Sequence, residues 1–245
     1  MQQLFNILEN VDSTNNYAMQ KIHEGMAKHG MCWFALNQFN GKGQRSKIWV
    51  SNPGENVILS TVIVPSTKFK IHEFYFNAIV ATSVRNVLQS ICSPKVEIKW
   101  PNDIYINDKK AGGMLIENKI NSTQWRWSVV GTGININQQE FGENNNATSV
   151  FNETNQKNDP IEIAKRIHSE IIDNLNNYNE AFNSTILEEY NSHLFNKNEI
   201  VKCSINNNDE QIKILFVDGE GNLHVEGFER DYLKFGEVIF YPRGN

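Results

Sequence analysis

The stretch that most constrains the fold runs from Lys99 to Glu117. Apolar and polar residues alternate from Asp103 to Ile106 and again from Lys110 to Glu117, with Asn107-Asp108 between the two runs. This pattern predicts a β-hairpin closed by a two-residue turn, because Asn and Asp tolerate positive φ. The expected cross-strand pairs are Ile106 with Lys109, Tyr105 with Lys110, Ile104 with Ala111 and Asp103 with Gly112.

The expected pairing places charged and small residues on one surface. Side chains alternate between faces along a strand, so Asp103, Tyr105, Lys110 and Gly112 are predicted to share a face. Asp103 and Lys110 are then diagonal neighbours, about 7–8 Å apart between backbones. Gly112 and Gly113 leave room for a ligand to lie against the backbone. Such a Lys–Asp pair is usually a solvated surface pair, and a small-molecule site is the alternative.

Composition narrows the class of protein. With 245 residues, of which 40% are hydrophobic, the chain suits one large domain and a small one. The net charge is −5 and no basic stripe is present, so a nucleic-acid partner is not expected. Cys32, Cys92 and Cys203 are far apart and indicate reduced thiols. Without a signal peptide or an apolar run that could span a bilayer, a soluble cytoplasmic protein without a membrane partner is expected.

A polar cluster precedes the first helical pattern. Asp12-Ser13-Thr14-Asn15 stands just before Tyr17, Ala18 and Ile22, which recur at helical spacing. Ser13 or Thr14 is therefore a candidate N-cap. A helix N-terminus also offers free N–H groups beside the hydroxyl and amide side chains, so the capping and ligand-binding interpretations are compatible.

A glycine-rich basic segment, Gly41 to Trp49, follows an expected strand at Met31–Leu36. It contains two glycines and three cations, and free N–H groups with positive charge suit a carboxylate or a phosphate. A solvated basic loop is the alternative. The spacing is not that of a P-loop.

A second glycine-containing segment, Trp125 to Asn137, is expected to be a strand with two unlike faces. Val130, Thr132, Ile134 and Ile136 share one face, and the other face carries the small polar set Gly131, Gly133, Asn135 and Asn137. The small polar face is poorly suited to packing in a core and well suited to lie beneath a ligand. The segment lacks the third glycine of a dinucleotide fingerprint and continues as a strand.

The remaining segments complete the expected architecture. Strands are predicted at Asn56–Val64 and Val96–Ile98, helices at His72–Ser90, Pro160–Phe182 and Ser184–Leu194, and a long loop at Phe141–Asp159. Short strands are predicted at Glu199–Ile205, Gln211–Val217, Asn222–Gly227 and Glu237–Tyr241. Their close spacing indicates a small β-barrel beyond a boundary near Asn196.

The familiar motifs of metal-dependent and nucleophilic catalysis are absent from the sequence. It contains no H-E-x-x-H, no G-x-S-x-G and no paired Cys–His spacing. A basic glycine loop, a Lys/Asp/Gly hairpin and a Gly/Asn strand remain. Such parts bind and polarise an anion and do not supply a nucleophile.

Four stretches together resemble the biotin protein ligases. They are Ser13-Thr14-Asn15, Gly41–Trp49, Lys99–Asp103 with Lys110–Gly113, and Gly131–Asn135. They follow the family's order and approximate spacing, and they cover the chain up to about Asn137. The resemblance implies an α+β fold, with a mixed, largely antiparallel sheet and packed helices of the class II synthetase-like type over residues 1–195. An SH3-like β-barrel would follow over residues 196–245.

The resemblance also implies an activity and its partners. Biotin and ATP would react to biotinyl-5′-AMP and pyrophosphate, with Mg²⁺ on the phosphates. The biotinyl group would then pass to a lysine of a biotin carboxyl carrier protein. Ser13-Thr14-Asn15 stands near the start of the sequence, so a monofunctional ligase without an N-terminal DNA-binding domain is expected, as a monomer or homodimer.

Residue roles are implied position by position. Lys110 and Asp103 would be catalytic, with Lys110 stabilising charge during adenylation and Asp103 orienting the carrier lysine or accepting its proton. The residues implied to bind biotin or the adenylate are Ser13, Thr14, Asn15, Gln38, Gly41, Lys42, Gly43, Gln44, Arg45, Lys110, Gly112 and Gly113. The residues implied to bind the nucleotide are Trp49, Asn102, Gly131 and Asn135.

The basic loop departs from the family pattern G-R-G-R-x-G-R-x-W. Lys42 and Lys47 replace two arginines, Ser46 replaces a glycine and Gln44 replaces the central arginine, while Arg45 occupies the variable position. The departure bears on how firmly the loop holds the intermediate. Two alternative functions stay open, a lipoate-type ligase and a non-catalytic protein that binds biotin or an adenylate.

Overall fold

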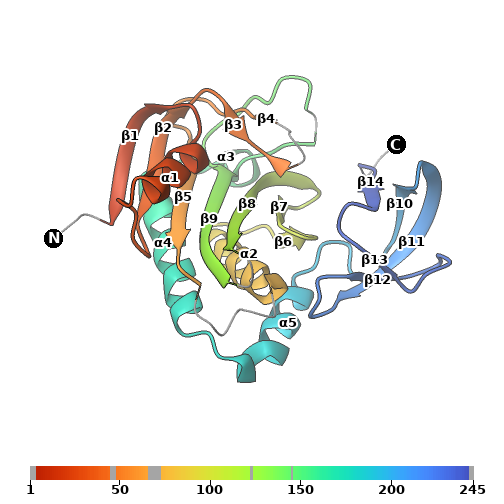
Figure 1. Ribbon diagram of the computed structural model, residues 1–245. Helices are drawn as coiled ribbons and strands as arrows, with labels where there is room; N and C mark the ends of the chain where they lie inside the picture. Colours follow the sequence, from red (N-terminus) through yellow and green to blue (C-terminus); the bar gives the residue numbers. More distant parts are fainter. Residues whose placement is uncertain (1–3, 45–47, 66–72, 122–123, 145, 243–245) are drawn as a thin grey trace.

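The computed structural model describes residues 4–44, 48–65, 73–121, 124–144 and 146–242. Its main feature is a seven-stranded sheet (Figure 1). In spatial order the strands are β1 (Phe5–Val11), β2 (Cys32–Gln38), β5 (Asn56–Ile63), β9 (Gln124–Asn135), β8 (Lys109–Asn121), β7 (Asp103–Ile106) and β6 (Val96–Lys99). β1 and β2 are parallel and all other neighbours are antiparallel. The predicted mixed, largely antiparallel sheet is confirmed.

The hairpin of β7 and β8 forms with one correction to its register. Ile106 pairs with Lys109 and Tyr105 with Lys110, as predicted, and Asn107 in the turn has a φ of 54°. A β-bulge then shifts the ladder by one residue, so Ile104 pairs with Gly112 and Asp103 with Gly113. The predicted pairs of Ile104 with Ala111 and Asp103 with Gly112 are therefore wrong, because an extra residue on β8 bends that strand.

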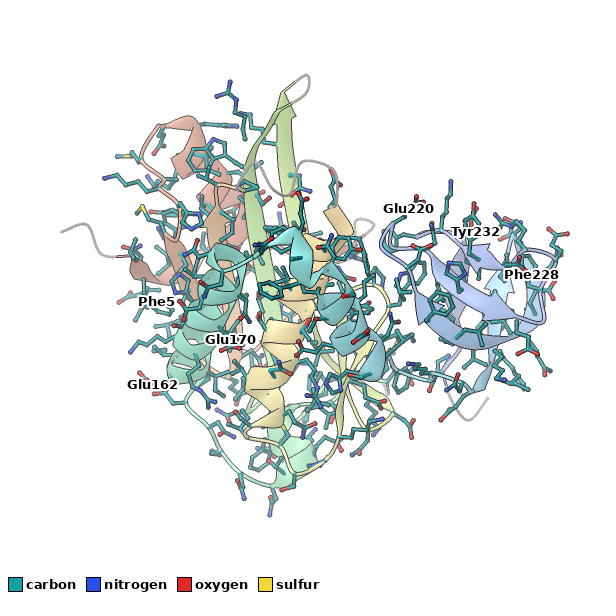
Figure 2. The ribbon with its side chains drawn as sticks, turned by 90° about the horizontal axis from the view of Figure 1, so that it is seen from below. Phe5, Glu162, Glu170, Glu220, Phe228 and Tyr232 are labelled. Carbon is teal, nitrogen blue, oxygen red and sulfur yellow. The ribbon has the colours of Figure 1, made fainter. Side chains whose placement is uncertain are left out.

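Helices cover the two faces of the sheet unequally. α2 (Glu73–Gln89), α4 (Pro160–Asn176) and α5 (Asn183–Ser192) lie on one face, while α1 (Thr14–His23) packs on the other (Figures 1 and 2). Pro160 occupies the first turn of α4, and Asp159 caps it through the N–H of Ile161. The apolar residues of α4 at helical spacing are buried: Ile163, Ile167, Ile171 and Leu175.

Two helical predictions need correction. α4 ends at Asn176, and Asn179 caps a separate 3₁₀ turn at Glu180–Phe182, so the predicted helix to Phe182 is interrupted. The segment predicted as a loop, Phe141–Asp159, contains the short helix α3 (Val150–Thr154), capped by Ser149. The physical reason is local capping by Asn and Ser side chains, which satisfies backbone N–H groups at new helix starts.

The glycine-rich basic segment contains a small ladder. β3 (Gly41–Lys42) pairs antiparallel with β4 (Ile48–Trp49). Residues 45–47 between them, which include the predicted site residue Arg45, lie outside the described residues. The segment is thus ordered at both ends by pairing, where a loop was expected.

The C-terminal module is a five-stranded antiparallel sheet. Its strands are β10 (Ile200–Ile205), β11 (Asn208–Val217), β12 (Leu223–Glu226), β13 (Tyr232–Leu233) and β14 (Val238–Phe240), in the order β13-β12-β11-β10-β14. Asn206 and Asn207, both with positive φ, form the tight turn between β10 and β11. Within the described residues β13 and β14 do not pair, so the sheet is open and the SH3-like barrel is not confirmed.

One hydrophobic core joins the large sheet and the module. Cys203, Ile212 and Leu223 of the module belong to the same buried cluster as Phe34 and Phe76. The cysteines Cys32, Cys92 and Cys203 are buried free thiols, as predicted. Burial raises the pKa of Cys32 to about 12 and those of Cys92 and Cys203 to about 11. These thiols are therefore protonated packing groups. No helix of the described chain is long and apolar enough to cross a membrane.

Candidate functional site

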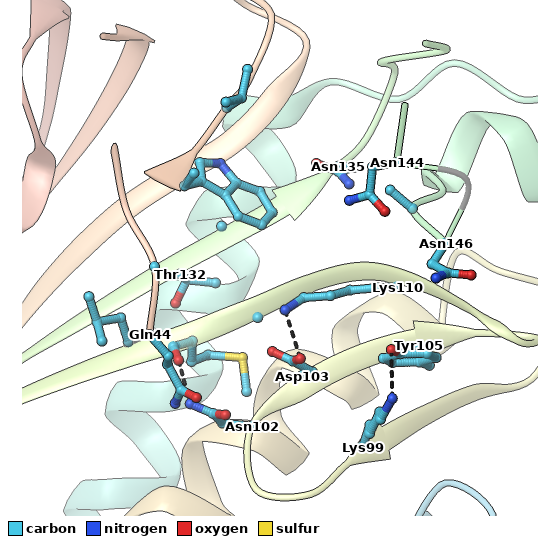
Figure 3. A pocket seen from close by; sticks show the side chains of 18 of the residues that line it. Gln44, Lys99, Asn102, Asp103, Tyr105, Lys110, Thr132, Asn135, Asn144 and Asn146 are labelled. Carbon is cyan, nitrogen blue, oxygen red and sulfur yellow. Dashed lines mark hydrogen bonds and ion pairs between the residues drawn. The ribbon is translucent and has the colours of Figure 1, made fainter. Parts of the chain in front are cut away.

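A cavity of about 1020 Å³ opens where the large sheet meets the module (Figure 3). Its floor is made by β7, β8 and β9, and its walls include the N-terminus of α1, the β3–β4 segment and residues 235–242 of the module. Most of the predicted site residues line it: Ser13, Thr14, Asn15, Gln38, Lys42, Gly43, Gln44, Trp49, Asn102, Asp103, Lys110, Gly113, Gly131 and Asn135. Segments far apart in the sequence thus meet at one concave surface.

Two predicted glycines do not line the cavity. A Cβ at Gly41 would collide with the Gln38 side chain and the Trp49 carbonyl, so Gly41 makes room for the β3–β4 ladder. A Cβ at Gly112 would collide with Gly133 and Ile134, beneath the floor. The bulge places Gly113 beside Asp103 instead, where a Cβ would lie 2.6 Å from Asp103 Oδ1.

Lys110 and Asp103 form an ion pair on the cavity floor. Lys110 Nζ lies 2.7 Å from Asp103 Oδ2, and the two side chains are 38% and 31% exposed (Figure 3). The main chain of Lys110 is held by the neighbouring loop, since its N–H donates to Asn146 and its carbonyl accepts from Thr148. The lysine is therefore anchored at its backbone, and its ammonium can exchange a carboxylate partner for another anion.

A buried polar cluster lies at the N-terminus of α1. Ser13 caps the helix, and the N–H of Thr14 donates to Gln38 Oε1 over 2.8 Å. Asn15 Nδ2 donates to Glu117 Oε2 over 2.7 Å, and its Oδ1 accepts from Ser60 Oγ. Hydroxyl and amide groups of this kind can match the donors and the acceptor of a cyclic urea.

An indole ring covers another part of the floor. Gly133 lies directly under Trp49, and a Cβ on Gly133 would be 2.8 Å from the indole. Asn135 Nδ2 donates to the Thr148 carbonyl over 2.9 Å, which ties the end of β9 to the loop. Trp49 Nε1 is buried and has no hydrogen-bond partner among the described residues. This end of the cavity combines an aromatic face with an unsatisfied donor.

All five residues of the motif Lys99–Asp103 line the cavity, and its first two residues also contact the module. Asn102 and Asp103 belong to the cavity: Asn102 Nδ2 donates to the Met114 carbonyl over 2.5 Å, and Asn102 Oδ1 has no partner among the described residues. Lys99 Nζ donates to the Tyr105 hydroxyl over 3.0 Å and lies 5.5 Å from the ring centre of Phe240. Burial raises the pKa of Tyr105, which therefore stays neutral beside that ammonium.

Sequence reasoning missed several residues of the site. Ser60 and Glu117 hold Asn15, and Phe235 and Tyr241 bring the module to the cavity. Ser60 carried a weak signal, because it is the one hydroxyl between Ile58 and Val62 on the strand face that these three residues share. The contacts themselves join residues 45 and 102 positions apart, and no local pattern contains them.

About half of the chain is similar to known proteins. The model of the Biotin/lipoate A/B protein ligase family matches residues 7–135. Over 137 residues the chain is 31% identical to the "Bifunctional ligase/repressor BirA" of Escherichia coli, covering 56% of this chain and 42% of that protein. It is 29% identical over 133 residues to the "Biotin--[acetyl-CoA-carboxylase] ligase" of Paracoccus denitrificans, covering 53% of each. The chain thus aligns with about half or less of each of these two relatives.

Solved structures show the same fold. A biotin protein ligase from Aquifex aeolicus in complex with biotin and ATP superposes with a TM-score of 0.76 at 22% identity, covering 98% of this chain and 99% of that one. The enzyme from Leishmania major in complex with biotinyl-5-AMP gives 0.68 at 19% identity, covering 96% and 100%. Because the family model matches more than half of the chain, this protein belongs to the biotin/lipoate A/B protein ligase family.

Proposed function

We propose that this protein activates biotin with ATP and transfers the biotinyl group to a lysine of a biotin carboxyl carrier protein. One observation carries the proposal: the polar cluster around Thr14, Asn15 and Gln38 opens into the same cavity as the Lys110–Asp103 pair. A ligand with a urea at one end and a carboxylate at the other suits both. The names of the relatives support this assignment.

Lys110 is suited to the adenylation step. A biotin carboxylate oxygen would attack the α-phosphorus of ATP, the bond to the β-phosphate would break, and pyrophosphate would leave. The ammonium of Lys110 would first bind the carboxylate and then stabilise the charge that develops on the α-phosphate. Its partly exposed partner Asp103 gives way to a substrate oxygen more readily than a buried partner would.

Asp103 is suited to the transfer step. The acceptor lysine must lose a proton before its nitrogen attacks the acyl carbon of biotinyl-5′-AMP and AMP leaves. Asp103 lies beside Gly113, where the floor has no side chain, so an incoming amine can approach its carboxylate. Asp103 would orient that amine and take its proton.

The nucleotide would occupy the end of the cavity at Trp49 and Asn135. The Trp49 ring offers a face for a base, and its free Nε1–H and Asn102 Oδ1 offer a donor and an acceptor. The residues that line the cavity fit a Mg²⁺ ion that the phosphates of ATP would mainly hold. The ion would neutralise part of the phosphate charge. Among the described residues, the acidic side chains that line the cavity are Asp103, Asp108 and Glu140, and no three His, Cys, Asp or Glu side chains form a metal cluster.

A lipoate-type ligase is the second candidate, because the family model includes both activities. Lipoate carries a dithiolane ring without N–H or C=O groups. It would leave the Gln38 Nε2 donor and the second lone pairs of Thr14 Oγ1 and Asn15 Oδ1 without hydrogen-bond partners, which is costly. The cluster therefore favours biotin.

Substrate-dependent exchange of labelled pyrophosphate into ATP tests the proposal. We expect exchange with biotin and little or none with lipoate, and labelling of a biotin carboxyl carrier protein when that acceptor is added. Exchange with lipoate alone would favour the second candidate. Binding of biotin without exchange would indicate a non-catalytic binder.

A further inference from the structure

A continuous chain of hydrogen bonds runs from outside the cavity to its polar cluster. Glu117, half-buried on β8 and not part of the cavity wall, accepts from Asn15 Nδ2 over 2.7 Å. Asn15 Oδ1 accepts from the hydroxyl of Ser60, which is fully buried on β5. Ser60 Oγ lies 2.7 Å from Thr14 Oγ1. Four side chains from α1, β5 and β8 are thus linked in series.

The carboxylate at one end sets the direction of every bond in this chain. An ionised carboxylate only accepts hydrogen bonds, so Asn15 must turn its NH₂ group toward Glu117. If the amide were reversed, two acceptor oxygens would face each other without a proton between them. With the NH₂ group committed, Asn15 Oδ1 must accept, and the single hydroxyl proton of Ser60 is used to satisfy it. With its own proton committed to Asn15 Oδ1, Ser60 Oγ can only accept in its 2.7 Å contact with Thr14 Oγ1. The Thr14 proton therefore goes to Ser60 and not to Gln38 Oε1, which lies farther away at 3.3 Å.

The same constraint determines what the cluster offers to a ligand. Thr14 Oγ1 gives its proton to Ser60, so its free lone pair can only accept, and Asn15 Oδ1 has a second lone pair as well. Gln38 Oε1 is occupied by the N–H of Thr14, so the free group of Gln38 is its Nε2 donor. Two acceptors and one donor complement the two N–H groups and one C=O of a cyclic urea.

Close packing prevents Asn15 from leaving this arrangement. Gly131 on β9 lies directly beneath the Asn15 amide, and a Cβ at that position would collide with Asn15 Oδ1. Asn15 is 4% exposed, and its Nδ2 also faces the Leu115 carbonyl at 3.4 Å. The amide therefore rests on the sheet in one orientation.

We propose that Glu117 and Ser60 are positioning residues that orient the hydrogen bonds of the cluster so that it accepts the N–H groups of a cyclic urea. This inference rests on the proposed function, and it goes further by assigning the specificity of the pocket to two residues that do not line it. Neither residue touches the ligand. Both act through Asn15 and Thr14.

The test uses the full-length protein and biotin-dependent pyrophosphate exchange. Glu117→Gln keeps the size of the side chain and removes the obligatory acceptor, because a glutamine can present either a donor or an acceptor to Asn15. Glu97→Gln is the matched control, since Glu97 is also on a strand and pairs with Lys95. Ser60→Ala removes the middle of the chain and serves as the second variant if Glu117→Gln does not fold.

We expect Glu117→Gln and Ser60→Ala each to raise the KM for biotin about tenfold, the value of one lost hydrogen bond. The KM for ATP and kcat should change less than about twofold, as in Glu97→Gln. The double variant should be about as impaired as the worse single variant, because both changes break the same chain. Wild type should reject biotin methylated on a ureido nitrogen, and both variants should discriminate against it less.

The outcomes separate this inference from the proposed function. If the wild type shows no biotin-dependent exchange, the proposed function is wrong and this inference with it. If the wild type is active and Glu117→Gln matches Glu97→Gln in its KM for biotin, only the positioning role is overturned. An equal rise in the KM values for biotin and ATP, or additive effects in the double variant, would also overturn it.

Discussion

Trp100 Nε1 donates a hydrogen bond of 3.0 Å to the carbonyl oxygen of Gly221, joining the large sheet to the C-terminal module. The same indole meets the ring of Phe235 edge-on, with ring centres 6.1 Å apart. One residue earlier, Lys99 lies over the ring of Phe240. The first two residues of the Lys99–Asp103 motif therefore line the cavity, as the other three do, and also hold the module against the large sheet.

Trp100→Phe should weaken the attachment of the C-terminal module to the large sheet. The change keeps an aromatic ring but removes the indole donor, and losing this half-buried hydrogen bond costs about 0.5–1.5 kcal/mol of folding stability. Denaturant unfolding and proteolysis in the module measure this loss. Trp127→Phe controls for lost ring size, because Trp127 is a partly buried indole that packs against a separate cluster containing Ala18 and Ile22 of α1. Equal stability losses in the two variants would contradict a role for the Gly221 hydrogen bond.

Two glycines of β9 should separate the binding of the two substrates. A Cβ at Gly131 collides with Asn15, and a Cβ at Gly133 comes within 2.8 Å of Trp49. We expect Gly131→Ala to raise the KM for biotin, and Gly133→Ala to raise the KM for ATP, each about tenfold and with the other KM less affected. Pyrophosphate exchange at varied biotin and ATP measures both values. The same KM rising in both variants would refute this assignment of the two ends of the cavity.

Gln44 should limit how firmly the intermediate is held. Gln44 lines the cavity, and an arginine there would replace a neutral hydrogen bond by one to a charged group. A hydrogen bond from the charged group is stronger than the neutral one by about 1 kcal/mol or more. Gln44→Arg is expected to slow dissociation of preformed biotinyl-5′-AMP about fivefold to tenfold and to leave biotin specificity unchanged. An unchanged dissociation rate would exclude a role for this position in retention.

Acid should destabilise the fold through His168. Burial lowers the pKa of His168, whose Nε2–H donates to the Gly30 carbonyl over 2.8 Å. The neutral form is favoured in the fold, so its stabilising effect is present above the unfolded pKa of about 6.5. It is lost as the pH falls through the lower folded value. Denaturant unfolding between pH 8 and pH 5 should show a smaller loss for His168→Gln than for wild type. Equal losses would show that His168 is not responsible.

Local patterns predicted what lies close together in the sequence. The turn at Asn107-Asp108, the pairing of Tyr105 with Lys110 and the ion pair with Asp103 all follow from one hairpin. The bulge was missed because Gly112 and Gly113 fit either register by size. β1 was missed because it is an edge strand with a single buried side chain, so its apolar alternation is weak.

Long-range contacts account for the rest of the site. Nothing near Glu117 in the sequence indicates that its carboxylate meets Asn15, and nothing near Trp100 indicates Gly221. These pairs are selected by how the sheet, α1 and the module pack, and packing depends on the whole chain. The predicted boundary near Asn196 stays a prediction, because the buried residues on both sides of it form one core.

The central claim is that one cavity activates biotin through the ammonium of Lys110. Its most direct measurement is biotin-dependent pyrophosphate exchange by Lys110→Ala, compared with Lys109→Ala, which changes the exposed lysine next to it. We predict that Lys110→Ala, folded with an unchanged melting temperature, loses exchange activity roughly 100-fold to 1000-fold. Lys109→Ala should retain it. Near-normal exchange by a folded Lys110→Ala protein would contradict the claim.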